Sequence, residues 1–102
     1  MRNLIPKRFN AFGVVVHTEF ADLDELGKHG DWDAATNTIR IEQTDTIQVQ
    51  EQTYFHELTH VITDALGIKM SHKNIDRFGN LIHQIMLTSE YDPNEHQTCD
   101  DE

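Results

Sequence analysis

The 102-residue chain is poor in cysteine and has no long apolar run. Its one cysteine, Cys99, excludes a disulfide within the chain, which suits a reducing compartment. No stretch approaches the length of a membrane-spanning helix, and the first residues lack the apolar region of a signal peptide. We therefore expect a cytoplasmic protein whose chain forms one small domain.

Basic residues are also scarce. Lysine and arginine together number 8, against 18 aspartates and glutamates, which gives a formal net charge of −10. No basic patch can be assembled beyond Lys7 and Arg8, and such a patch is what binds a phosphate backbone. The composition argues against nucleic acid and membrane surfaces as partners, and it favours a well-solvated surface.

Two segments have the composition of β-strands. Residues 12–20 are rich in β-branched and aromatic side chains, and residues 38–42 alternate so that Ile39 and Ile41 share one face. Residues 31–37 are interpreted as the turn region of a hairpin that ends in the second strand. Because that strand comes just before a long helical segment, we expect it to form the sheet edge along which a peptide can pair.

A long helix is expected over residues 46–66. Asp45 as N-cap and Gln48 as the third helical residue make a capping-box arrangement, and Gly67 supplies the stop. The predicted buried stripe follows the 3–4 spacing of a helix and consists of Tyr54, Leu58, Val61 and Ala65, widened by Phe55 and Ile62.

A second helix is expected over residues 72–90, with Ser71 as its N-cap. The connector after the first helix is short, which predicts antiparallel packing, and Gly79 favours close approach of the two helices. Residues 93–102 are polar and acidic and are predicted to form a loose tail. The predicted apolar face of this helix comprises Ile75, Phe78, Leu81, Ile82, Ile85 and Met86.

These elements predict an α+β fold. A small antiparallel or mixed sheet would pack on the long helix and on the second, C-terminal helix, within a domain of residues 1–92.

The first helix carries the motif H-E-x-x-H, formed by His56, Glu57 and His60. Residues four apart lie one turn apart on one helix face, so the two imidazoles can bind one metal ion from the same side. Zinc suits such nitrogen ligands and lowers the pKa of a bound water to about 7, and Glu57 can then act as the general base. Asp64 falls one further turn along, where it can support a ligand histidine. Two solvated surface histidines are the simpler alternative.

A catalytic zinc site needs a third protein ligand. The candidates after His60 are His72, Asp76 and His83. His72 begins the second helix on its inward side, and Asp76 lies one turn further, so His72 can bind the ion while Asp76 orients an imidazole. The reverse assignment, with Asp76 as the ligand, stays open. His83 lies about three turns away from His72 and is expected at the edge of the core.

The segment HELTHVITD, from His56 to Asp64, resembles the active-site helix of thermolysin-type zinc metallopeptidases, the gluzincins. The segment SHKNIDRFGNL, from Ser71 to Leu81, is similar to their second helix, which carries Glu-x-x-x-Asp. The small size looks like the minimal gluzincin domains, including small bacteriophage-encoded metallopeptidases and the protease domain of bacterial anti-repressors. The resemblance implies one zinc ion per chain on His56, His60 and His72, with Glu57 as base and Asp64 and Asp76 supporting the ligands.

The chain departs from that family in two ways. His72 stands where the family has a ligand glutamate, and three neutral imidazoles leave a zinc site at a charge of +2 rather than +1, which makes bound water more acidic and less nucleophilic. Larger members also use a downstream His or Tyr to stabilise the tetrahedral intermediate. Here Tyr54, His83 and Tyr91 are the available candidates.

The expected function is therefore a zinc-dependent peptidase that acts on a peptide or protein substrate. The alternative is a non-catalytic module in which zinc ties two helices together and the domain binds or regulates a protein partner. Glu57 separates the two hypotheses, because a purely structural zinc site has no use for a general base.

Overall fold

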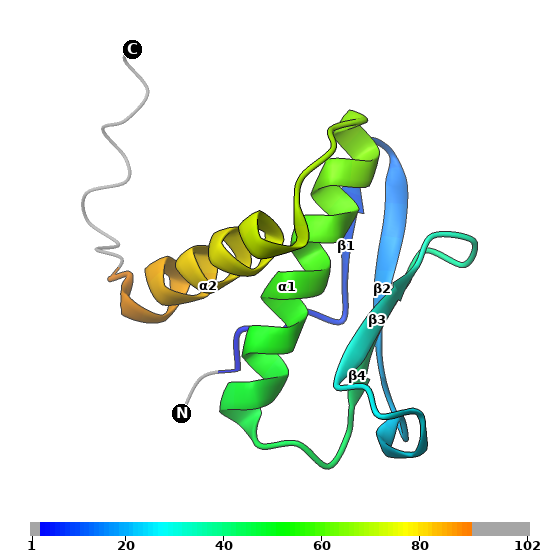
Figure 1. The fold of residues 1–102 in the computed structure, drawn as a ribbon, viewed down its shortest axis with the longest axis vertical. Coiled ribbons are helices and arrows are strands. Elements are labelled where there is room, and N and C mark those ends of the chain that lie inside the picture. Colours follow the sequence, from blue (N-terminus) through cyan, green and yellow to red (C-terminus); the bar gives the residue numbers. More distant parts are fainter. Residues whose placement is uncertain (1–2, 91–102) are drawn as a thin grey trace.

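The computed structural model of the chain describes residues 3–90. The predicted tail at residues 93–102 and Tyr91 lie outside the described residues. The strands and helices, in chain order, are β1 (Arg8–Ala11), β2 (Val14–Ala21), the short 3-10 turn η1 (Asp24–Leu26), β3 (Gly30–Asp33), β4 (Thr38–Glu42), α1 (Ile47–Leu66) and α2 (His72–Thr88). The four strands form a mixed sheet with one face on α1, and α2 crosses α1 on its other side (Figure 1), so the α+β class is confirmed.

The strand predicted over residues 12–20 begins two residues later, because its first two residues form a tight turn. Phe12 and Gly13 both have positive φ, 52° and 80°, which is the requirement of the two-residue hairpin turn that matches strand twist. β1 therefore ends at Ala11, and β2 begins at Val14, directly opposite it. The composition of residues 12–20 predicted strand throughout because it does not distinguish a bulky turn residue from a strand residue.

The sheet order is β1-β2-β4-β3. β4 pairs in parallel with β2 and antiparallel with β3, so both of its edges are used. The predicted hairpin ending in residues 38–42 is confirmed, but the expectation that this strand is the free edge is wrong. Part of the segment read as a turn forms β3, and β3 is the edge strand next to α1.

Two glycines set how closely the layers approach. A Cβ at Gly30 would lie 2.7 Å from the carbonyl oxygen of Arg40 and would also meet the side chain of Thr53, so a larger residue would push β3 away from α1. A Cβ at Gly79 would lie 3.0 Å from the backbone of His56. The close approach of the helices predicted from Gly79 is therefore confirmed.

The two helices begin and end close to the predicted residues. The N-cap of α1 is Thr46, whose side chain accepts a hydrogen bond from the amide of Val49, so the predicted capping box at Asp45 is off by one residue. Gly67 ends α1 in the left-handed conformation, and Ser71 caps α2 by accepting from the amide of Asn74. Within residues 3–90, neither helix is both long and apolar enough to cross a membrane.

The core lies between the sheet and α1. The buried cluster of this core consists of Val16, Ile39 and Ile41 from the sheet and Tyr54, Phe55 and Val61 from α1. The partly buried residues packed against this cluster include Leu58, Trp32, Ile82 and Met86. Ala65, which was predicted in the buried stripe of α1, is exposed.

The second helix packs on the first at an oblique angle. Figure 1 shows α2 running obliquely across α1, and Gly79 lies where the two helices meet, on the backbone of Phe55 and His56. α2 buries only part of its apolar face: Ile75 is buried, while Phe78, Leu81 and Ile85 are 42%, 58% and 53% exposed.

Candidate metal centre and its cleft

Three histidines converge where α2 crosses α1. The ring of His56 lies 5.1 Å from that of His60 and 5.4 Å from that of His72, measured between centroids. One nitrogen from each of the three lies within 4.8 Å of the others. Tetrahedral zinc with bonds of about 2.0–2.1 Å needs about 3.4 Å between ligand nitrogens. The ligand nitrogens would therefore have to draw closer on binding, and three imidazoles are a donor set of the kind that holds a zinc ion.

Asp76 orients one of these imidazoles. Its Oδ1 lies 2.8 Å from Nδ1 of His56. A carboxylate at this distance favours the tautomer with its proton on Nδ1, which would leave Nε2 as the electron-pair donor for a metal. Asp76 is one turn beyond His72 on α2, and Gly79 brings that turn onto the backbone of His56.

The charge state of His60 also suits metal binding. Burial lowers its pKa, and the neighbouring His56 acts in the same direction, whereas Asp64 opposes the shift. A lowered pKa keeps the imidazole neutral at physiological pH, and the neutral form is the one that binds a metal.

Glu57 is buried and lines the same cleft as His56. It is only 8% exposed. Burial raises its pKa to about 7, and the negative charge of Asp31 adds to the shift, while Lys28 opposes it. A carboxyl group with that pKa exchanges a proton readily near neutral pH, which is the property of a general base. A cation on the three histidines would lower this pKa again.

Asp64 has a different partner from the one its position suggested. Its Oδ2 accepts a hydrogen bond of 2.8 Å from Nε1 of Trp32, in the edge strand β3. Among the described residues, the ligand imidazoles have no hydrogen bond or ion pair with Asp64. Asp64 therefore ties the end of α1 to β3 and influences His60 only through its charge.

Two of the three residues considered for stabilising a tetrahedral intermediate lie in the core. Tyr54 is 3% exposed and packs edge-on against Phe55. His83 is buried, stacks on Phe55 at 5.5 Å between ring centroids, and pairs with Glu51 at 3.0 Å. His83 thus occupies the core, where it was expected at the edge, and neither side chain lines the cleft described next.

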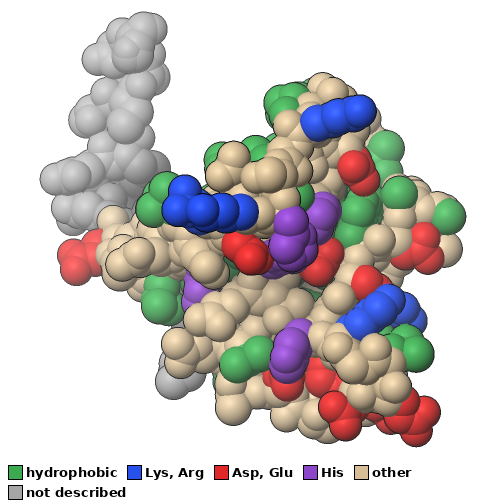
Figure 2. All heavy atoms as spheres, in the orientation of Figure 1, with side chains coloured by type: hydrophobic (Ala, Val, Ile, Leu, Met, Phe, Trp, Pro, Cys, Tyr) green, Lys and Arg blue, Asp and Glu red, His purple; other side chains and the backbone are tan. Residues whose placement is uncertain are grey.

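An open cleft of about 270 Å³ lies next to the metal centre. Its floor is α1, one wall is α2, and the other wall is the start of β3. In Figure 2 histidine side chains form a group at the centre of this face, with acidic side chains beside them. The cleft is lined by His56 and Glu57 together with His29, Gly30, Gln52, Thr53 and Asn80.

His29 was not identified from the sequence. Its Nδ1 lies 2.7 Å from Oδ2 of Asp45, and its imidazole lines the cleft. No spacing in the sequence connects His29 with His56, because the two residues line the same cleft only when β3 lies against α1. The close approach of Gly30 to the side chain of Thr53 brings His29 to the rim of that cleft.

Comparison of the chain with protein-family models, with curated proteins and with solved structures found no match.

Proposed function

We propose that the protein is a small zinc-dependent peptidase, with a minimal zincin-like fold. The observation that carries the proposal is the convergence of one nitrogen each from His56, His60 and His72 within 4.8 Å, beside the buried carboxyl group of Glu57. Zinc bound there would supply Lewis-acid activation of a carbonyl group and of water.

Glu57 has the position and acidity of the general base. It takes a proton from the attacking water as the new C–O bond forms, and it passes that proton to the leaving amine as the C–N bond breaks. His56 and Glu57 line the same cleft, so a peptide bond that lies there is within reach of both.

The edge strand β3 supports the binding of an extended peptide. It borders the cleft at Gly30, and its outer edge is not paired with another described strand. A peptide added to that edge would gain main-chain hydrogen bonds without any demand on its side chains. In this proposal β3 takes the role that the sequence suggested for residues 38–42.

A zinc-stabilised, non-catalytic module is the second candidate. It is favoured by the burial of Tyr54 and His83, which leaves neither beside the reacting carbonyl. A metal shared by the two helices would also fasten the start of α2 to α1.

The substitution Glu57→Gln separates the two functions. We expect this variant to retain one zinc ion per chain and to lose cleavage of a quenched-fluorescent peptide library, because Gln cannot accept the proton. The control is Gln48→Glu, which places a carboxylate on the same helix at an exposed position outside the cleft and should leave wild-type activity largely intact. Full activity in Glu57→Gln would exclude the peptidase mechanism, and zinc content without any wild-type cleavage would favour the module.

A further inference from the structure

We propose that His29, oriented by Asp45, contacts the main chain of a peptide that extends along the cleft from the three histidines. This inference rests on the proposed function, and it adds a peptide-binding residue to the site. The first observation is position: His29 lines the same cleft as His56 and Glu57, but it is not part of the group that could hold a metal.

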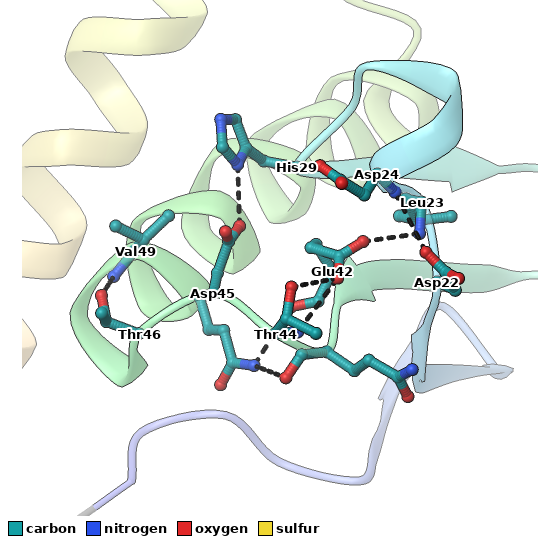
Figure 3. A network of polar contacts seen from close by, with 11 residues as sticks. Asp22, Leu23, Asp24, His29, Glu42, Thr44, Asp45, Thr46 and Val49 are labelled. Atoms are coloured by element: carbon teal, nitrogen blue, oxygen red, sulfur yellow. Dashed lines mark hydrogen bonds and ion pairs between the residues drawn. The ribbon is translucent and has the colours of Figure 1, made fainter.

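The second observation is the orientation of the ring. Nδ1 of His29 lies 2.7 Å from the carboxylate of Asp45, so Nδ1 carries a proton and donates it. Figure 3 shows the other ring nitrogen on the side away from Asp45. Nε2 is thus free to accept from a peptide N–H when the ring is neutral, or to donate to a peptide carbonyl when it is charged.

The third observation is the rigidity of the support. The backbone carbonyl of His29 accepts a hydrogen bond of 2.8 Å from the amide of Glu42. The carboxylate of Glu42 is buried and accepts from the amides of Leu23 and Thr44, as the dashed lines in Figure 3 show. His29 and Asp45 are therefore attached to the same fixed corner of the fold, which reduces the loss of freedom on binding.

The exposure of the pair argues against a purely structural role. The side chain of His29 is 70% exposed, and that of Asp45 is 19% exposed. Ion pairs in such a setting contribute little to the free energy of unfolding. The carboxylate of Asp45 instead holds the imidazole of His29 at the rim of the cleft in an orientation suited to binding a ligand through Nε2.

The remaining lining residues indicate what the contact recognises. Gln52, Thr53 and Asn80 are polar and uncharged, so these three residues supply no charge that would select a particular side chain. Main-chain amides are present in every peptide. The contact of His29 should therefore make the binding affinity depend on how far the peptide extends from the three histidines, rather than on its sequence.

Two hydroxamates test the assignment on the zinc-loaded protein. Acetohydroxamate occupies the metal centre alone, whereas a dipeptidyl hydroxamate with the same metal-binding group also extends into the cleft. We expect His29→Ala to weaken the dipeptidyl hydroxamate about tenfold, which corresponds to the loss of one good hydrogen bond, and to leave acetohydroxamate unchanged. Asp45→Asn should weaken the dipeptidyl compound in the same direction. His17→Ala, which removes an exposed histidine of β2, is the matched control and should change neither.

The outcomes distinguish this inference from the proposed function. Equal binding of both hydroxamates by His29→Ala and the wild type would overturn the role of His29, and so would a wild type that binds the dipeptidyl compound no more tightly than acetohydroxamate. If the selective loss in His29→Ala is observed but the wild type cleaves no peptide, the catalytic proposal fails and the peptide contact stands. If peptides are cleaved equally well by wild type and His29→Ala, with equal KM, the contact fails and the catalytic proposal stands.

Discussion

Asp76 lies on α2, the helix that also carries His72, and its carboxylate is 2.8 Å from Nδ1 of His56 on α1. One turn of α2 therefore provides both a candidate ligand and the group that orients another ligand on α1. The candidate metal centre depends on the position of α2 as much as on the H-E-x-x-H motif.

Removing the orienting carboxylate should weaken zinc binding without abolishing it. We expect Asp76→Asn to lower the zinc affinity about 10–100-fold, because the substituted amide holds the His56 tautomer less firmly. His72→Ala should lower it further, since it removes a ligand. Competition with a fluorescent chelator measures both values. Asp64→Ala is the comparison: its carboxylate contacts Trp32, so a loss as large as that of Asp76→Asn would contradict this division of roles.

Gly79 should be essential to the seating of α2. In Gly79→Ala the new methyl group would lie 3.0 Å from backbone atoms of His56, which cannot rotate away. We expect the overpacking cost of about 1–3 kcal/mol to exceed the gain of about 1 kcal/mol in helix propensity, and zinc affinity to fall as His72 moves outward. Urea unfolding and zinc titration test this. Gln84→Ala, at an exposed position of the same helix, should stabilise slightly and leave zinc binding unchanged.

The pKa of Glu57 makes the stability of the zinc-free protein depend on pH. Its pKa rises from 4.5 to about 7 on folding, so folding disfavours the charged form. The free energy of unfolding should fall as pH rises from about 4.5 to about 7 and then stay level with respect to this group. Glu57→Gln should therefore be more stable than the wild type by about 1–3 kcal/mol at pH 8, and the gap should close at pH 4.5.

Urea unfolding in the presence of a chelator measures that gap at the two pH values. A gap of equal size at both would show that the ionisation of Glu57 is not its cause. Saturating zinc should narrow the gap at pH 8, because a cation beside the carboxylate offsets the cost of its burial.

The hydrogen bond between Trp32 and Asp64 should contribute to the stability of the contact between β3 and α1. Trp32→Phe keeps an aromatic ring in the partly buried site but removes the indole N–H. A double-mutant cycle with Asp64→Ala should give a coupling free energy of about 0.5–1.5 kcal/mol, the range for one hydrogen bond. Additive effects of the two substitutions would show that the bond contributes nothing to stability.

The sequence predicted the parts of the fold that depend on local chemistry. Gly67 and Ser71 locate the end of α1 and the start of α2, because caps act within a few residues. The periodicity of α1 placed Tyr54 and Val61 in the core. The three histidines that converge in the structure were also selected from the sequence, since two of them share a helix face.

Features that depend on contacts distant in the chain were missed or misassigned. Parallel pairing of β2 with β4 moves residues 38–42 into the sheet interior and makes β3 the edge, and no local pattern reveals that order. The oblique packing of α2 on α1 leaves Phe78, Leu81 and Ile85 exposed, although their spacing predicts burial. His29 reaches the cleft only through the contact of β3 with α1, so the sequence carries no signal for it.

The position of α2 outside the sheet–α1 layer also implies an order in which the molecule should open. The sheet and α1 form the buried cluster, whereas the apolar residues of α2 that pack against it are the partly buried Ile82 and Met86. Opening α2 would therefore cost less than unfolding the whole domain, and backbone amides of α2 should exchange with solvent faster than those of α1. A metal ion shared by His72 and the two α1 histidines would slow that exchange, so hydrogen exchange along α2 would report directly on metal occupancy.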